Sequence, residues 1–225
     1  MSKRLSERIG IYGGTFDPVH NGHIEIARRV ARNFGLDKLL IVPTSRPPHK
    51  DHGSISDAYH RYAMAVLATI DDPRLFVSTV ELEAPDRPYT FQTVERLREM
   101  YGDKAQYFFI MGADSFSELD TWREPERLIA SVNILVAARP GVEISFSHLP
   151  ETVRASIVDL RGQADEVRID TESRAKQSKI FLTDYVEADI SSTQIRRMVG
   201  EGRSIKGLVP PTILDYIEKY ELYRR

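Results

Sequence analysis

The sequence predicts an α/β protein whose parallel sheet is covered by helices on both faces. Short apolar runs such as Lys38–Val42 and Tyr107–Met111 alternate with segments of helical periodicity. Alternation of this kind is typical of right-handed βαβ units. The apolar runs have no polar face, as expected for strands that are buried on both sides of a parallel sheet.

The first strand is expected at Arg8–Tyr12 and the first helix from Gly22 to about Asn33. Apolar residues at positions 24, 27, 30, 31 and 34 have the spacing of one buried helical stripe. Gly35 follows this stripe directly, where a glycine commonly ends a helix.

The remaining elements follow in order along the chain. A second strand at Lys38–Val42 ends at Pro43, and residues 44–54 are rich in Pro, His, Lys and Gly, which indicates a loop. Further strands are expected at 75–82, 107–111, 133–137 and 179–183, and further helices at 56–70, 89–100, 126–130, from about 190, and 211–220. The polar segment 142–179 is expected to hold a helix and an irregular excursion. Three loops, at 13–14, 43–44 and 112–114, follow parallel strands, so they should meet at one crevice.

Composition narrows the class of protein. The chain has 225 residues without a Gly/Ser/Pro-rich linker, so we expect one domain over residues 1–225. The formal net charge of −2 disfavours a nucleic-acid binder, and the absence of cysteine excludes disulfides, thiolate metal sites and cysteine nucleophiles. The N-terminus has no apolar signal segment, and no apolar run approaches the roughly 20 residues of a membrane span. We expect a cytoplasmic protein with no membrane partner.

Residues 13–23 read G-G-T-F-D-P-V-H-N-G-H and follow the first expected strand. Gly13 and Gly14 are expected to let the backbone turn tightly and approach a ligand. The helix that follows offers unpaired N–H groups and the positive end of its dipole. His20 and His23 share one face of its first turn. This pattern favours a nucleotide-handling enzyme.

The two histidines have three interpretations. As metal ligands they would need further partners, and no cysteine is available. As phosphate contacts they need only the helix N-terminus and a bound polyphosphate, whose charge their N–H groups could stabilise. A capping and packing role is the third interpretation, and the preceding glycines favour phosphate over it. For Asp17 we favour a cap or turn role over catalysis, while the N–H groups around Phe16 could face a phosphate.

A second helix start reads I-S-S-T-Q-I-R at residues 190–196. Capping accounts for one of its three hydroxyls. Arg196 lies one turn after Thr193, so it could reach the same anion as the helix N-terminus. Lys50, in the loop P-P-H-K, is either a cation over the crevice or a solvated lysine. Trp122 is either a core residue or a surface on which a flat substrate ring stacks.

Missing motifs restrict the reaction class. The sequence has no G-x-x-x-x-G-K-[ST] loop, no G-x-G-x-x-G fingerprint and no G-x-S-x-G elbow. What remains is positioning chemistry, in which a phosphate oxygen attacks the α-phosphorus of a nucleoside triphosphate. Such a reaction needs cations, N–H donors and usually Mg²⁺, and no protein nucleophile.

Together these motifs resemble the H-x-G-H nucleotidyltransferase superfamily and, within it, the bacterial nicotinate mononucleotide adenylyltransferases. The segments P-Y-T-F-Q-T at 88–93, M-G-A-D-S-F at 111–116 and T-W at 121–122 carry the finer resemblance, as do V-P-x-x-x-P-P-H-K at 42–50 and the final V-P-P motif with its Tyr and Leu-Tyr. The resemblance implies a Rossmann-like, doubly wound parallel sheet with a C-terminal helical segment. It also implies transfer of AMP from ATP to nicotinate mononucleotide, giving nicotinate adenine dinucleotide and pyrophosphate in NAD biosynthesis, with Mg²⁺ accompanying ATP.

The resemblance also implies roles for individual residues. His20, His23, Lys50 and Arg196 would be catalytic, and the pyridine ring would stack on Trp122. The expected ATP site comprises Gly13, Gly14, Thr15, Phe16, His20, His23, Gly112, Asp114, Ile190, Ser192, Thr193 and Arg196. The expected mononucleotide site comprises Thr15, Lys50, Tyr89, Thr90 and Trp122. No metal-binding residue is expected, and a homo-oligomer is compatible with the sequence.

Three alternatives stay open at this point. The acceptor could be nicotinamide mononucleotide, because a carboxylate-selective pocket can rely on backbone N–H donors alone. It could be phosphopantetheine, whose enzymes share the first motif. The chain could also be a catalytically silent nucleotide-binding protein on the same fold. Segment 142–179 matches no motif and is interpreted as a species-specific insertion, an oligomer contact or a flexible flap.

Overall fold

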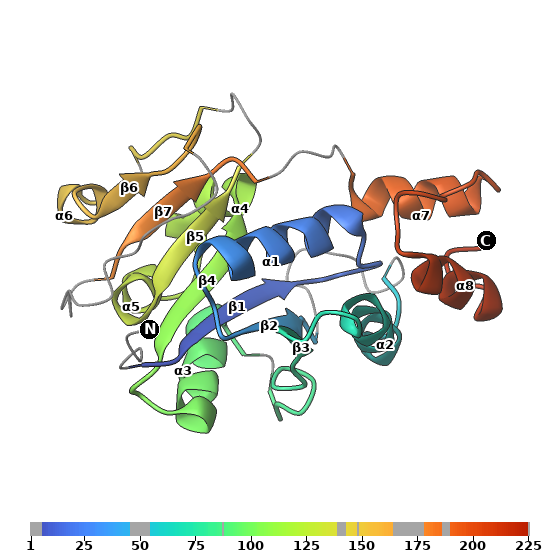
Figure 1. The fold of residues 1–225 in the computed structure, drawn as a ribbon, viewed down its shortest axis with the longest axis horizontal. Coiled ribbons are helices and arrows are strands. Elements are labelled where there is room, and N and C mark those ends of the chain that lie inside the picture. Colours follow the sequence, from blue (N-terminus) through green and yellow to red (C-terminus); the bar gives the residue numbers. More distant parts are fainter. Residues whose placement is uncertain are drawn as a thin grey trace.

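The computed structural model describes residues 6–45, 55–86, 88–138, 143–147, 149–163, 178–185 and 190–224. These residues form a seven-stranded sheet, in which the strands lie in the order β3-β2-β1-β4-β5-β7-β6 (Figure 1). All of its pairings are parallel, which confirms the predicted fold class. The strands are β1 (Arg8–Gly14), β2 (Lys38–Pro43), β3 (Leu75–Val77), β4 (Gln106–Gly112), β5 (Asn133–Ala137), β6 (Ile157–Asp159) and β7 (Ile180–Thr183).

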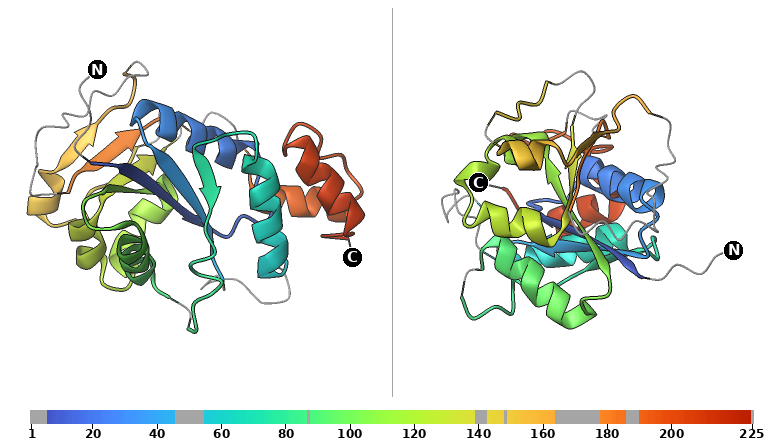
Figure 2. Two further views of the ribbon diagram at one scale, coloured as in Figure 1. Left: turned by 60° about the horizontal axis from the view of Figure 1, so that its bottom comes forward. Right: turned by 90° about the vertical axis from the view of Figure 1, so that its left-hand side faces the viewer.

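Helices lie on both faces of the sheet, with α1 on one face and α3 on the other (Figure 1). They are α1 (Asn21–Asn33), α2 (Ala58–Thr69), α3 (Thr90–Tyr101), α4 (Ala113–Ser117), the 3₁₀ turn η1 (Leu119–Thr121), α5 (Pro125–Ser131), α6 (Glu151–Arg154), α7 (Ser192–Gly200) and α8 (Pro211–Lys219). Helices α7 and α8 form a separate pair beside α2, at one end of the molecule (Figure 2). This pair is the predicted C-terminal helical segment.

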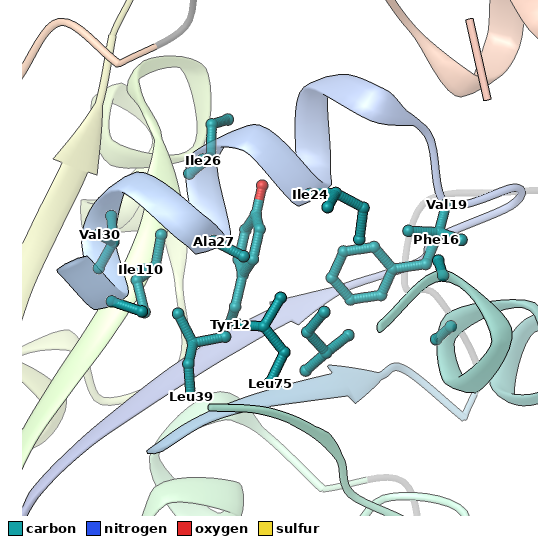
Figure 3. Close-up of a cluster of buried hydrophobic side chains, with 14 of the residues drawn as sticks. Tyr12, Phe16, Val19, Ile24, Ile26, Ala27, Val30, Leu39, Leu75 and Ile110 are labelled. Carbon is teal, nitrogen blue, oxygen red and sulfur yellow. The ribbon is translucent and has the colours of Figure 1, made fainter. Parts of the chain in front are cut away.

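Alternate residues of each strand supply two hydrophobic cores. In β2, Leu39 and Ile41 face the core under α1, whereas Leu40 and Val42 face the core under α3. The period of two along a strand explains this division. Figure 3 shows Tyr12, Phe16 and Ile24 packed between α1 and the strands beneath it. The site described below borders this α1 core.

Helix α1 follows its predicted pattern closely. The predicted stripe is buried, with exposed fractions of 0–4% from Ile24 to Phe34. The helix ends with the N–H of Gly35 on the Arg32 carbonyl and the N–H of Leu36 on the Ala31 carbonyl. These two bonds form a Schellman motif, and Gly35 has the left-handed φ of 54° that the motif requires.

Two elements differ from the expectation. The strand expected at 75–82 ends at Val77, because Ser78 and Thr79 begin turns in which Oγ of Ser78 accepts from Val80 N and the Thr79 carbonyl accepts from Glu83 N. The polar segment 142–179 holds a strand in addition to a short helix: β6 extends the sheet beside β7. Three residues are too few for the alternation that identifies a strand.

Among the described residues, no helix has both the length and the hydropathy needed to cross a membrane.

Candidate active site

The candidate site lies where the strand order reverses, between β1 and β4. Gly14 of β1 pairs in register with Pro43 of β2, and the Gly14 carbonyl accepts from Thr44 N at 2.9 Å. Gly112 ends β4, the parallel neighbour on the other side of β1. The three strand ends at which loops were predicted therefore lie at the same edge of the sheet, where open α/β sheets bind ligands, although residues 13–14 belong to β1 and α4 begins at Ala113.

Gly13 and Gly14 complete β1, so the expectation that they form a tight turn is wrong. The turn follows at Phe16, which has a left-handed φ of 49°. The Phe16 ring would lie 2.9 Å from a Cβ on Gly14, so the glycine makes room for this ring. The ring in turn packs edge-on against His23, with 5.0 Å between the ring centroids. Gly14 thus acts through packing rather than through backbone freedom.

The two histidines lie together at the start of α1, as predicted. His20 is the N-cap residue, and its ring stacks on that of His23 with 3.6 Å between centroids. The backbone N–H of His20 donates to Nδ1 of His23 at 3.3 Å. A neutral His23 that accepts at Nδ1 carries its proton on Nε2. Gly22 accommodates the pair, because a Cβ there would lie 3.2 Å from Nδ1 of His20.

His20 is only 5% exposed. Burial lowers the pKa of its imidazole from 6.5 to about 4, so the ring is neutral at pH 7. Its Nδ1 is buried without a hydrogen-bond partner among the residues that the structure describes. A buried polar atom in this state is uncommon in folded proteins and is one mark of a ligand site.

Helix α7 docks on the turn between β1 and α1. Ser191 caps α7 by accepting from Gln194 N at 3.2 Å, and Ser192 Oγ donates to the Pro18 carbonyl at 2.9 Å. Arg196 donates to the Asp17 carbonyl at 2.7 Å and to Thr193 Oγ1 at 3.3 Å. The three hydroxyls therefore have three different partners, and both predicted phosphate motifs lie side by side.

Asp17 lies in the turn before α1, which confirms the turn half of its predicted role, but it is not the cap of that helix. His20 caps α1, whereas the Asp17 carboxylate is fully buried and accepts from Ser56 N and from Tyr223 Oη. The Arg196 guanidinium lies 3.8 Å from it. Asp17 is therefore a structural centre that joins the first motif to three distant segments.

Sequence reasoning missed two residues of this centre, Arg61 and Tyr223. Arg61 is 1% exposed and donates to three backbone carbonyls, those of Thr15, Ser45 and Ser56. A signal for Arg61 was present, because it occupies one helical stripe with the buried residues 64, 65 and 68 of α2. Tyr223 is the last residue of the C-terminal V-P-P motif quoted above, but that motif indicated no role for it at the site.

The electrostatics at this place favour an anion. Helices α1 and α7 have no acidic residue in their first turns. Their N-termini therefore present a positive dipole end that no side-chain carboxylate of that turn neutralises.

Three of the predicted mononucleotide residues, Tyr89, Thr90 and Trp122, lie on the α3 side of β1 and β4, whereas Thr15 lies between β1 and α1. Trp122 is half-buried and packs edge-on against Phe109 of β4, whose ring lies 3.7 Å from a Cβ built on Gly13. This contact places Trp122 one side chain away from the end of β1. Tyr89 is 55% exposed and stacks on Phe91, and Thr90 begins α3.

The remaining predicted residues make fewer contacts with the two phosphate motifs or lie outside the described residues. Gly112 and Asp114 are exposed at the start of α4, and a Cβ on Gly112 would meet nothing within 4 Å. Ile190 packs against the α1 core just before α7. Lys50 lies outside the described residues.

Within the described ranges, no three His, Asp or Glu side chains are grouped so that they could hold a metal ion.

Comparisons with known proteins identify the family of this chain. The cytidylyltransferase-like family model matches residues 11–198. A probable nicotinate-nucleotide adenylyltransferase of Thermoanaerobacter sp. (strain X514) is 38% identical over 218 residues, covering 97% of this chain and 95% of the relative. Its counterpart in Leifsonia xyli subsp. xyli is 35% identical over 224 residues, covering 100% and 98%.

Solved structures share the fold. The nicotinic acid mononucleotide adenylyltransferase of Plasmodium falciparum, complexed with NaAD, has a TM-score of 0.70 at 20% identity and covers 96% of this chain and 97% of its own. A putative nicotinate-nucleotide adenylyltransferase of Vibrio parahaemolyticus has a TM-score of 0.63 at 17% identity, covering 97% and 96%. The family match and the full-length relatives together show that this chain belongs to the cytidylyltransferase-like family, among the nicotinate-nucleotide adenylyltransferases.

Proposed function

We propose that the protein transfers the adenylyl group of ATP to nicotinate mononucleotide, a reaction of NAD biosynthesis. The observation that carries the site assignment is the pairing of two phosphate motifs, in which Arg196 and Ser192 of α7 bond to the turn that leads into His20 and His23. The curated relatives that match the chain over its full length carry the name nicotinate-nucleotide adenylyltransferase.

The triphosphate would bind between the N-termini of α1 and α7. His23 would donate from Nε2 to a phosphate oxygen, because its Nδ1 already accepts from the backbone. His20, neutral at pH 7, would donate a hydrogen bond without adding charge. Arg196 would supply the positive charge, together with Lys50. The expected ATP contacts of Gly13, Thr15, Phe16, Gly112, Asp114, Ile190 and Thr193 belong to this proposal.

The reaction needs no protein nucleophile. A phosphate oxygen of the mononucleotide attacks the α-phosphorus of ATP, the bond from that phosphorus to the bridging oxygen breaks, and pyrophosphate leaves. The negative charge that grows on the transferring group is stabilised by N–H donors and cations held in place beforehand. We propose that Mg²⁺ arrives with ATP, held by phosphate oxygens and water.

The pyridine ring would stack on Trp122, with its carboxylate at the start of α3 beside Tyr89 and Thr90. Helix α3 has no acidic residue in its first turn, so its positive end can attract a carboxylate. A carboxamide gains less from this dipole, which favours nicotinate over nicotinamide mononucleotide.

The test is steady-state pyrophosphate release with ATP, Mg²⁺ and three acceptors: nicotinate mononucleotide, nicotinamide mononucleotide and phosphopantetheine. We expect kcat/KM to be highest for nicotinate mononucleotide. A preference for phosphopantetheine would reject the mononucleotide site. Failure of every acceptor, in a folded protein that binds ATP, would indicate a silent nucleotide-binding protein.

A further inference from the structure

The Asp17 carboxylate is the most deeply buried charge beside the phosphate motifs, with no exposed surface. It lies in the turn between Phe16 and Pro18. Its donors are the backbone N–H of Ser56, at 3.3 Å and 3.4 Å from the two oxygens, and the Tyr223 hydroxyl. A buried carboxylate is costly unless donors or cations compensate its charge, so each of these partners matters.

Tyr223 makes the shortest of these contacts, at 2.7 Å from Tyr223 Oη to Asp17 Oδ1. The chain reaches Asp17 after α8 through two residues with left-handed backbone, Glu221 at φ 50° and Tyr223 at φ 65°. Such backbone is unfavourable for residues other than glycine and is kept where the surroundings hold it. Burial and the neighbouring Asp17 raise the pKa of Tyr223 far above its ordinary value, so its hydroxyl stays a donor at any usable pH.

Arg196 is the cation that shares this carboxylate with Tyr223. Its Nη1 donates to the Asp17 carbonyl at 2.7 Å and lies 3.8 Å from Oδ2, while 16% of its side chain is exposed. Arg61 is also attracted to Asp17, but its guanidinium is already bonded to three carbonyls. Without the tyrosine hydroxyl, Arg196 is therefore the group that can move closer to the carboxylate.

We infer that Tyr223 is a positioning residue for adenylyl transfer: its neutral hydroxyl satisfies Asp17 and so leaves the Arg196 guanidinium directed at the phosphates of ATP. This inference rests on the proposed function, since it assigns Arg196 to ATP. Tyr223 lies outside both phosphate motifs. The inference gives it a role toward ATP and none toward the mononucleotide.

The test compares Tyr223→Phe with Tyr220→Phe, which removes a hydroxyl from a half-exposed tyrosine at the end of α8. For Tyr223→Phe we expect kcat/KM for ATP to fall about tenfold, the loss typical of a hydrogen bond to a charged group. The KM for the mononucleotide should change by less than about twofold, which is close to experimental scatter. Tyr220→Phe should match the wild type. Equal ATP parameters in the two variants, or equal losses for both substrates, would overturn the inference.

A double-mutant cycle with Arg196→Lys distinguishes positioning from general support of the fold. If Tyr223 acts through Arg196, its substitution should cost less than about twofold once Arg196 is replaced, because coupled residues are not additive. A loss of about tenfold in both backgrounds would reject the inference.

A third variant covers the case in which Tyr223→Phe folds poorly. Asp17→Asn combined with Tyr223→Phe removes the charge that would attract Arg196, so kcat/KM for ATP should recover to within about threefold of the wild type. No recovery, in a protein with a normal unfolding transition, would contradict the inference.

Turnover by the wild-type protein distinguishes failure of the proposed function from failure of this inference. If the wild type shows no turnover with any acceptor, the proposed function fails. Calorimetric titration with a non-hydrolysable ATP analogue then still tests Tyr223, for which we expect about tenfold weaker binding in Tyr223→Phe than in Tyr220→Phe.

Discussion

The phosphate side of the candidate site and its mononucleotide side differ in how they are built. On the phosphate side, hydrogen bonds from α2, α7 and the segment after α8 converge on the turn at residues 15–18. On the mononucleotide side, Tyr89 is more than half exposed and Trp122 rests on one ring of the core. The first side is fixed before any ligand binds, and the second presents open surfaces.

The ligands proposed for the two sides account for this difference. A triphosphate needs several donors whose positions are set in advance, because reorganising dipoles during the reaction would raise the barrier. A pyridine ring needs an apolar plane, which one half-buried indole provides. The comparison therefore predicts that substitutions on the phosphate side affect folding and turnover, whereas those on the mononucleotide side affect mainly binding.

The largest effect is expected for Arg61→Met. The substitution leaves three backbone carbonyls without their donor and removes a cation that attracts the buried Asp17, so that Arg196 is its remaining cationic neighbour among the described residues. Breaking a buried charge network typically costs about 3–5 kcal/mol, and urea unfolding would measure this loss. Arg28→Met is the control, because Arg28 is half-exposed and meets Asp72 at 3.6 Å, an ion pair worth about 1 kcal/mol or less. Equal losses in the two variants would mean that the phosphate side is not held by this network.

The next effect is expected for His23→Ala, with a loss of about 100-fold or more in kcat. The variant lacks the Nε2 donor to the transition state, while the backbone of α1 can remain intact. Steady-state pyrophosphate release gives kcat, and thermal unfolding checks the fold. His60→Ala is the control, since His60 bonds to Tyr216 in α8. A His23→Ala enzyme with full kcat would remove His23 from catalysis.

A smaller effect is expected in the pH dependence of stability. His20 takes up a proton near pH 6.5 when unfolded but only near pH 4 when folded. Between these values the unfolded state binds more protons, so the free energy of unfolding falls as the pH falls through this window. From pH 7 to pH 5 the contribution of His20 is about 2 kcal/mol.

His20→Asn provides the comparison for this measurement, because asparagine can still cap a helix. The difference in unfolding free energy between wild type and variant should shrink by about 2 kcal/mol as the pH is lowered from 7 to 5. Parallel curves for the two proteins would show that burial does not hold His20 neutral.

The smallest effect is expected for Trp122→Ala, with a rise of about tenfold in the KM for the mononucleotide. The KM for ATP should stay unchanged, because Trp122 packs against Phe109 and the core under α3, on the opposite face of the sheet from α1. Trp122→Phe keeps an aromatic plane and should lose less. If Trp122→Ala weakened ATP as strongly as the mononucleotide, the two sides would not be separate.

Most of the fold could be predicted from the sequence because the signals are local. The apolar run Lys38–Val42 and the stripe from Ile24 to Phe34 each match one periodicity, and both elements occur as predicted. Strand β6 could not be predicted, because its three residues form a strand only through pairing with β7. The early end of β3 depends on side-chain bonds of Ser78 that no periodicity records.

Some parts of the candidate site could be predicted from the sequence and others could not. The residues of the two phosphate motifs follow from short patterns, and the structure brings them together. The centre at Asp17 could not be foreseen, because residues 17, 61, 196 and 223 lie far apart in the sequence and are joined by hydrogen bonds and charge attraction only in the fold. The role of Gly14 was also misjudged, since its value lies in the space left for the Phe16 ring.

Gly22 shows how the histidine motif limits its own variation. A methyl group at residue 22 would stand 3.2 Å from Nδ1 of His20, closer than most real contacts of this kind. The imidazole of residue 20 therefore requires glycine, which has no side chain, at position 22. A relative that carries a smaller side chain at position 20 is released from the glycine, whereas one that retains the imidazole must retain the glycine or displace the ring. Residue 22 should accordingly change in evolution only where residue 20 has become smaller or its ring has moved.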